Sequence, residues 1–167
     1  WMPMSDYLGS LAISHIAVNP NNPDSVWAAT GDFDTSGLTS GNTIGVILST
    51  DGGTNWEVTS LIKDPTFGSS TLRKIIINPQ NTDNLIVAGR RGIWKTLDAG
   101  KTWIKVCDSI ITDIEFNPLN PNIIFAAMGQ LYGGGTAGVI KSTNFGDTWQ
   151  VLETGIPPKG QISRVEI

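Results

Sequence analysis

Cysteine and histidine are nearly absent from this 167-residue sequence, and each shortage excludes a class of site. Cys107 is the only cysteine, so the sequence forms no internal disulfide and no thiolate metal cluster. Its simplest role is that of a small buried hydrophobic residue. His15 is the only histidine, which excludes a histidine-rich metal site, and the apolar run AISHIAVN around it favours a packed or hydrogen-bonded side chain.

Charge is also scarce. Only 16% of the residues are charged, 40% are hydrophobic, and the formal net charge is −4. The 11 lysines and arginines are scattered, with adjacent pairs only at Arg73-Lys74 and Arg90-Arg91. A nucleic-acid-binding surface needs clustered positive charge, so no nucleic-acid partner is expected. No apolar run approaches the ~18 residues of a membrane helix, so no membrane insertion is expected.

Turn-forming residues, by contrast, are abundant. The sequence holds 19 glycines and 9 prolines among many Asn, Ser and Thr residues, which favours an all-β chain with many turns. Its length suits one domain with a sizeable core. The sequence starts at Trp1 and stops at Ile167 within a strand-like pattern, so we expect a segment of a longer protein.

Two sequence elements recur three times. The first is a turn that ends in tryptophan: STDGGTNW at 49–56, TLDAGKTW at 96–103 and STNFGDTW at 142–149. The second joins two apolar runs through Asn-Pro: HIAVNPNNPDSVWAAT at 15–30, KIIINPQNTDNLIVAG at 74–89 and DIEFNPLNPNIIFAAM at 113–128. Proline cannot extend a strand ladder, so each Asn-Pro marks a turn between two strands. A third strand precedes each tryptophan turn, and a fourth is expected to start at the tryptophan.

Four short antiparallel strands in each unit of about 40–60 residues are typical of a β-propeller blade. We therefore predict an all-β fold, a partial β-propeller of four-stranded antiparallel blades over residues 1–167. The predicted blades are 11–61, 70–107 and 109–152, and 161–167 is predicted to be the first strand of a next blade. Three blades cannot close a ring, and an open array exposes strand edges. The remaining blades of the same parent chain are therefore expected partners.

Each position of the tryptophan turn has a physical task. The acid, Asp51 or Asp98, can accept backbone N–H groups of its own turn, and the glycine can take the positive φ that a tight hairpin needs. The tryptophan can cover the adjacent strand, and the first hydroxyl can bridge the turn. The predicted structural residues are Ser49, Asp51, Gly53, Trp56, Thr96, Asp98, Gly100, Trp103, Ser142, Asn144, Gly146 and Trp149.

These turns resemble the Asp-box, or bacterial neuraminidase repeat, of sialidases, sortilin-type receptors and several glycoside hydrolases. Two positions depart from that pattern: Asn55 stands where threonine is usual, and Asn144 stands in place of the acid. Asparagine can make the hydrogen bonds of the turn, but it cannot act as a carboxylate catalyst. We therefore interpret the recurring acid as a clamp of the turn and not as a catalyst.

The chain as a whole is similar to secreted or surface propeller proteins of the Bacteroidota, in which propellers often precede a C-terminal sorting domain. The likeness rests on WMPMSD at 1–6, LAISHIAVNPNNPDSVWAATGD at 11–32 and GVILSTDGGTNW at 45–56. It implies that the bacterial protein is secreted or placed at the cell surface, and it identifies no ligand.

The segments between the second and third strands vary most in length, and those at 31–43 and 129–138 are the long ones. Variable loops on a rigid scaffold are where binding residues usually lie. The residues predicted to face a ligand are Asp32, Asp34, Arg90, Arg91 and Tyr132, with the link 64–69 nearby. The two arginines can bind a carboxylate or a sulfate. Solvated loop tips without a role are the alternative for each of these residues.

A calcium site is a separate hypothesis. Asp32, Asp34 and Ser36, followed by Gly37, resemble the first half of a calcium loop, in which alternating oxygens converge on the ion. The twelfth position holds Thr43 in place of a bidentate glutamate. The alternative is an ordinary polar turn. No other cofactor is expected.

Three alternatives for function follow. The first is a non-catalytic extracellular propeller that presents loops to a glycan or to a secreted or surface protein. The second is part of a glycoside hydrolase, sialidase-like or xyloglucanase-like, that acts on a polysaccharide. The third is an architectural spacer. Resemblance to sialidases would imply an arginine triad, an Arg-Ile-Pro motif and a Tyr–Glu pair, which are not evident here, and hydrolysis needs two carboxyl groups at a set separation. We therefore favour the non-catalytic module and assign no catalytic residue.

Overall fold

The computed structural model describes residues 6–9, 12–33, 43–68, 70–129 and 137–154, which form three four-stranded antiparallel sheets. The first sheet contains β1 (Ile13–Val18), β2 (Val26–Thr30), β3 (Val46–Ser49) and β4 (Glu57–Val58). The second contains β5 (Leu72–Ile77), β6 (Leu85–Gly89), β7 (Gly92–Thr96) and β8 (Ile104–Cys107). The third contains β9 (Ile111–Asn117), β10 (Asn120–Met128), β11 (Gly138–Ser142) and β12 (Gln150–Val151), and a short 3-10 helix, η1 (Ser60–Lys63), follows the first sheet.

Strands pair in chain order within every sheet, so each sheet is an up-and-down meander. This is the blade predicted from the repeat, and the prediction of an all-β propeller segment is confirmed. Each fourth strand begins one residue later than expected, immediately after Trp56, Trp103 or Trp149. In the first sheet the reason is visible, because the Trp56 N–H donates to the Tyr7 hydroxyl (2.6 Å) and not to a strand. The strand predicted at 161–167 lies outside the described residues.

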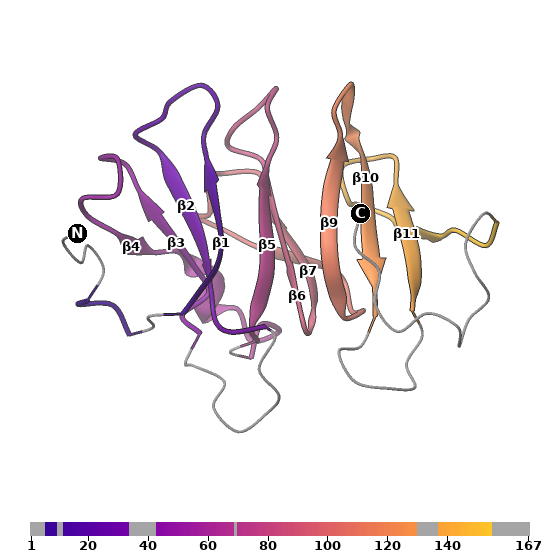
Figure 1. The fold of residues 1–167 in the computed structure, drawn as a ribbon, viewed down its shortest axis with the longest axis horizontal. Helices are drawn as coiled ribbons and strands as arrows, with labels where there is room; N and C mark the ends of the chain where they lie inside the picture. Colours follow the sequence, from indigo (N-terminus) through magenta and orange to yellow (C-terminus); the bar gives the residue numbers. More distant parts are fainter. Residues whose placement is uncertain (1–5, 10–11, 34–42, 69, 130–136, 155–167) are drawn as a thin grey trace.

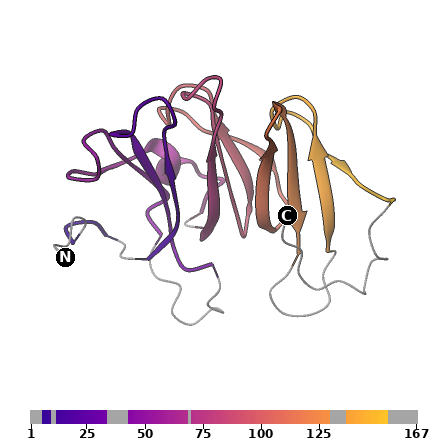
Figure 2. The ribbon, with the colours of Figure 1, turned by 45° about the horizontal axis from the view of Figure 1, so that its top comes forward.

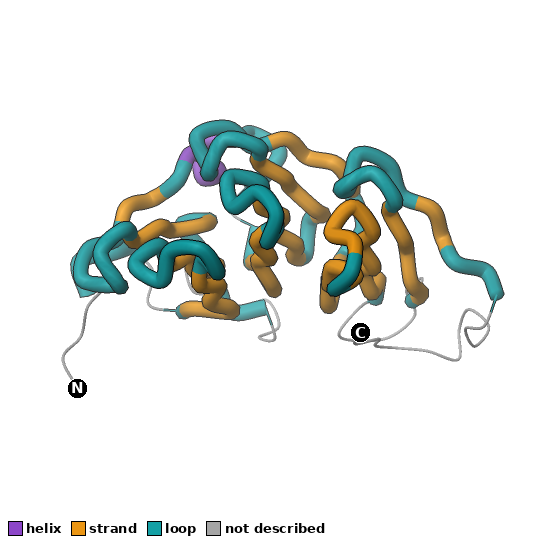
Figure 3. The backbone as a smooth tube through the Cα atoms, turned by 90° about the horizontal axis from the view of Figure 1, so that it is seen from above, coloured by secondary structure: helices purple, strands orange, loops and turns teal. Residues whose placement is uncertain are grey.

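The three sheets stand side by side along an arc (Figures 1 and 3). The first strands are neighbours, since β1 packs on β5 and β5 packs on β9. One hydrophobic core lies between the first and second sheets, and another lies between the second and third. Large members of the first core are Trp27, Val46, Leu72 and Trp94. Large members of the second are Ile86, Ile93, Ile114 and Ile140.

The two central strands of the middle sheet are buried on both faces, which explains their composition. All five residues of β6 (LIVAG) and of β7 (GIWKT) are buried. Successive side chains of a strand point to opposite faces, so a strand covered on both sides needs apolar residues at nearly every position. Lys95 and Thr96 of β7 are the polar exceptions. The Lys95 ammonium pairs with Asp147 of the third sheet's tryptophan turn, and the Thr96 hydroxyl is bonded within the second turn.

The first strand of each sheet carries a β-bulge at the same position. Pairing with the second strand skips one residue between Ile13 and His15, between Leu72 and Lys74, and between Ile111 and Asp113. The extra residues are therefore Ser14, Arg73 and Thr112. An equivalent bulge in all three sheets shows that the repeat extends to backbone detail.

Candidate functional site

The two rims of the stacked sheets carry different kinds of segment. The Asn-Pro turns and the tryptophan turns share one rim, here called the turn rim (Figure 2). Within each blade one backbone hydrogen bond joins the two turns: Gly52 N–H to Asp24 O (2.9 Å), Ala99 N–H to Asp83 O (2.9 Å) and Phe145 N–H to Asn122 O (3.0 Å). The segment after β2 and the β6–β7 turn lie on the opposite rim, here called the loop rim.

Each tryptophan turn is closed by its own side chains. In the first, the Ser49 hydroxyl accepts the Gly53 N–H (2.8 Å) and donates to the Asp51 carboxylate (2.8 Å), which accepts the Asn55 N–H (2.8 Å). The second turn repeats this pattern with Thr96 and Asp98, and the third with Ser142 and Asn144. The glycines have the positive φ that the sequence predicted, 91°, 77° and 80° at Gly53, Gly100 and Gly146. The hydrogen bonds support a clamp.

Both acids of these turns have a lowered pKa. The backbone N–H of Asn55, followed by its side-chain amide and the Ser49 hydroxyl, lowers the pKa of Asp51 to about 2. The Thr102 hydroxyl and backbone N–H, followed by the Thr96 hydroxyl, lower the pKa of Asp98 to about 2. A carboxyl group that is ionised throughout the ordinary pH range is a poor general acid, which again favours the clamp.

The low pKa values predict acid sensitivity. Asp51 and Asp98 have a folded pKa of about 2 against an ordinary 3.8, so the stability they contribute is present above pH 3.8 and is lost as the pH falls toward 2. Asn144 makes the same bonds without titrating. The double variant Asp51→Asn/Asp98→Asn should therefore show a smaller fall in Tm than the parent between pH 4.5 and pH 2.5, followed by circular dichroism. Equal falls in both proteins would contradict this account.

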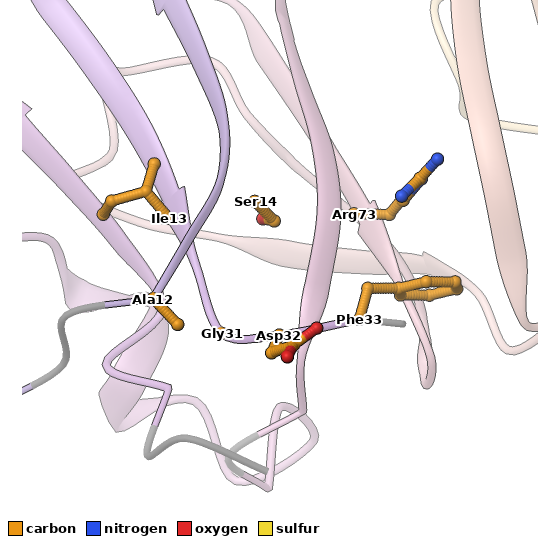
Figure 4. Close-up of a pocket in the computed structure, with 7 residues that line it drawn as sticks. All are labelled: Ala12, Ile13, Ser14, Gly31, Asp32, Phe33 and Arg73. Atoms are coloured by element: carbon orange, nitrogen blue, oxygen red, sulfur yellow. The ribbon is translucent and has the colours of Figure 1, made fainter. Parts of the chain in front are cut away.

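A pocket of about 330 Å³ opens on the loop rim at the seam between the first and second sheets (Figure 4). Its lining comes from β1, from the segment after β2 and from β5: Ala12, Ile13, Ser14, Gly31, Asp32, Phe33 and Arg73. Gly31 turns the chain out of β2 with a φ of 103°, and its N–H donates to the Ala12 carbonyl (2.8 Å). Asp32 is exposed, so a carboxylate stands beside apolar side chains at the mouth of the pocket.

Phe33 anchors the base of the loop that follows β2. It is 2% exposed, and two guanidinium groups of the second blade lie over its ring, Arg73 at 5.6 Å and Arg90 at 5.4 Å from the centroid. Arg90 also donates from Nε (3.1 Å) and Nη2 (2.6 Å) to the Phe33 carbonyl. The second blade therefore holds Phe33, at the end of the described segment after β2.

The predicted ligand-facing residues divide into three groups. Asp32 lines the pocket, and Arg90 lies next to it but is engaged with Phe33. Arg91 is exposed, and its guanidinium lies over Gly68, so the link 64–68 is nearby as expected. Asp34, Ser36 and Tyr132 lie outside the described residues. A ligand contact by any of these residues stays a prediction.

Phe33, Arg73 and Ser14 were not predicted as site residues. A signal was available: once the three units are aligned on Asn-Pro, Arg73 falls where the other units have the hydroxyls of Ser14 and Thr112. The contact of Arg73 with Phe33 joins positions in different units, and no local pattern reports it.

Charged side chains form a second polar group on the first strands. The residues that follow the bulges are His15, Lys74 and Asp113, and the Lys74 ammonium donates to Asp113 (2.9 Å) and to Glu115. Burial alone would lower the pKa of Lys74, but the bonds to Glu115 and Asp113 outweigh it and raise the pKa. Burial, and next the Lys74 charge, lower the pKa of His15. The neutral form of His15, a half-buried side chain, is therefore favoured.

Neither a cluster of metal-binding side chains nor a membrane-spanning helix is present among the described residues. They contain no group of three or more His, Cys, Asp or Glu side chains arranged to hold a metal ion. The predicted calcium site includes Asp34 and Ser36, outside those ranges, and stays a prediction. No helix in the described part of the chain is long and apolar enough to span a membrane.

Curated relatives of this chain are xyloglucanases, and no protein-family model matches it. A xyloglucanase of Paenibacillus sp is 29% identical over 117 residues, which cover 64% of this chain and 11% of that protein. A xyloglucanase of Hypocrea jecorina (strain QM6a) is 28% identical over 170 residues, which cover 84% of this chain and 20% of that protein. The chain thus spans a fifth or less of these relatives.

Solved structures with the same fold include a GH74 enzyme and YCF48. An ancestral GH74 enzyme matches with a TM-score of 0.67 and 22% identity over 91% of this chain and 19% of that one. YCF48 from Cyanidioschyzon merolae matches with a TM-score of 0.54 and 18% identity over 87% of this chain and 38% of that one. With three stacked four-stranded sheets, the chain is a segment of a β-propeller. Proteins that share a fold can differ in function, so the fold alone does not identify what this chain binds or does.

Proposed function

We propose that this chain is a non-catalytic, extracellular β-propeller module of a longer protein and that it binds a glycan at the loop rim. The pocket carries the proposal, because it pairs the exposed Asp32 carboxylate with the apolar side chain of Ile13, which is 39% exposed. A carboxylate accepts hydrogen bonds from sugar hydroxyls, and apolar side chains cover the C–H faces of the ring. Xyloglucan is the first glycan to test, since curated relatives are xyloglucanases.

A binding role is favoured over catalysis by the number of carboxyl groups. Glycoside hydrolysis generally uses two, one on each side of the scissile bond. Asp32 is the one carboxylate among the described residues that line the pocket. Asp113 and Glu115, on the first strand of the third sheet, are bonded to Lys74.

The second candidate function is that the chain forms part of a glycoside hydrolase, and the 28–29% identity to xyloglucanases favours it. In that case the partner carboxylate of Asp32 would lie elsewhere in the longer chain. Release of reducing sugar from xyloglucan by the full-length protein, abolished by Asp32→Asn, would establish this alternative over the binding module.

Further blades of the parent chain are the proposed partners in the fold. Ile16, Ile75 and Ile114 occupy equivalent positions on the first strands, two residues after each bulge. Ile75 and Ile114 are 0% exposed because the preceding sheet covers them, but Ile16 is 55% exposed. The open face of the first sheet therefore fits another blade.

We also assign the tryptophan turns to the Asp-box type found in sialidase- and sortilin-like propellers. We place the protein at the bacterial cell surface or in the medium, as in the Bacteroidota.

Asp32→Asn is expected to weaken xyloglucan binding at least about tenfold, because hydrogen bonds to a charged acceptor are stronger than those to a neutral amide. Isothermal titration of the chain with xyloglucan measures this. The matched control is Asp83→Asn, which changes an exposed carboxylate on the turn rim and should leave the affinity unchanged. Equal affinity of Asp32→Asn and the parent would remove the pocket from the proposal.

A further inference from the structure

Arg73 departs from the repeat at the bulge of the first strand. In the first sheet the bulge residue is Ser14, whose hydroxyl donates to the Ala29 carbonyl (3.1 Å) of the neighbouring strand. In the third sheet it is Thr112, whose hydroxyl donates to the Ala127 carbonyl (3.3 Å). These two bonds are equivalent and stay within one sheet. The second sheet has an arginine at this position, and its side chain leaves the sheet.

The Arg73 side chain reaches both neighbouring blades. Its Nε donates to the carbonyl of Thr112 (3.0 Å), at the bulge of the third sheet. Its guanidinium lies over the ring of Phe33, which belongs to the first blade. One side chain of the middle blade thus contacts the loop base on one side and the next inner strand on the other. A serine or threonine is too short to make either contact.

The Phe33 contact bears on the pocket. Phe33 follows Asp32 directly, so a force that fixes the ring also fixes the backbone that carries the Asp32 carboxylate. Arg90 holds the Phe33 carbonyl, and Arg73 adds a second cation over the ring. Figure 4 shows Arg73 and Phe33 on the same side of the pocket, with Asp32 adjacent on the segment below.

We propose that Arg73 is a positioning residue, which holds Phe33 in place and so presents the Asp32 carboxylate to a ligand in the pocket. The ligand part rests on the proposed function, but the positioning part does not. If the bulge needed only a hydrogen bond to its own sheet, a hydroxyl would serve, as it does at Ser14 and Thr112. Of the three bulge residues, Arg73 is the one that brings a charged side chain to the pocket.

The test restores the repeat. Arg73→Thr places at the second bulge the residue found at the third, so the sheet is expected to fold with a Tm close to that of the parent. Xyloglucan affinity should fall at least about fivefold, because a loosely held carboxylate binds less well. Amide hydrogen exchange at Gly31, which is bonded to Ala12, should become about tenfold faster. Exchange at Val87 in β6 should not change.

Two further variants complete the experiment. Arg73→Lys keeps a cation but loses the planar group, and it should give intermediate exchange at Gly31; it decides the question should Arg73→Thr fail to fold. Thr112→Ser keeps the bulge hydroxyl and the carbonyl that Arg73 uses, and it should match the parent in binding and exchange.

Unchanged exchange at Gly31 in both Arg73 variants would overturn the proposal. Faster exchange by the same factor at Gly31 and Val87 would also overturn it, because that result describes a residue that stabilises the whole fold. Should the parent not bind xyloglucan, the proposed function loses this ligand, and the local exchange at Gly31 alone decides the role of Arg73.

Discussion

Gly92→Ala is expected to destabilise the chain by about 3 kcal/mol or more, the largest effect foreseen for a single methyl group. Gly92 starts β7 with a φ of 135°, a conformation that is essentially open to glycine alone. An added Cβ would also overlap the Cys107 carbonyl oxygen and approach the Lys105 side chain to 2.9 Å. Urea unfolding followed by tryptophan fluorescence measures the loss.

The third sheet offers the matched control, Gly138→Ala. Gly138 starts β11 as Gly92 starts β7, but its φ is not positive, and the nearest atom to an added Cβ is the Met128 methyl group at 3.5 Å. The change in unfolding free energy should stay under about 1 kcal/mol. Similar losses at both glycines would show that the strand start, and not the Gly92 conformation, is sensitive.

Trp94→Ala should cost about 3–5 kcal/mol, as removal of a fully buried aromatic side chain does. Trp94 is 0% exposed and lies edge-on to Phe67, with ring centroids 5.5 Å apart. Its Nε1 donates to the Thr66 hydroxyl (3.1 Å), and the Lys105 ammonium lies 5.3 Å from its ring. The substitution therefore leaves a cavity in the core between the first two blades. It also removes the hydrogen bond to Thr66, in the link that joins these blades. Denaturant unfolding of variant and parent gives the difference.

Trp56→Ala is the control for Trp94→Ala. Trp56 ends the first tryptophan turn, is partly exposed and donates from Nε1 to the Gly53 carbonyl of its own turn (3.0 Å). Its loss removes less buried area, so about 1 kcal/mol is expected. A larger loss at Trp56 than at Trp94 would contradict the assignment of the core to the seams between blades.

Departures from the repeat identify the candidate site better than residue type alone. Arginine in place of a bulge hydroxyl at Arg73 lies beside the pocket, and the pocket also contains Asp32 from one of the two long loops. Where the units agree, as in the tryptophan turns, the side chains are bonded to their own backbone. Agreement between units at the tryptophan turns thus corresponds to scaffold, and the differences at Asp32 and Arg73 lie at the pocket.

Local interactions made much of this protein predictable. The closed tryptophan turns follow from the sequence because their hydrogen bonds join residues two to four positions apart, as Ser49 with Gly53 and Asp51 with Asn55. The strand pairs follow because each turn joins two strands that are consecutive in the chain. Proline, glycine and short polar side chains favour these turns without help from the rest of the chain. The all-β class and the repeated four-stranded unit were determined at this level.

The pocket and its supports were decided by tertiary structure. Arg73 meets the Thr112 carbonyl across 39 positions and Arg90 meets the Phe33 carbonyl across 57, in both cases between different blades. Such contacts depend on how the sheets stack, and stacking is set by side chains spread over whole sheets, such as Trp27 and Trp94. A charge that looks solvated in its own turn, as Arg90 does, therefore becomes a fixed support once the neighbouring blade is in place.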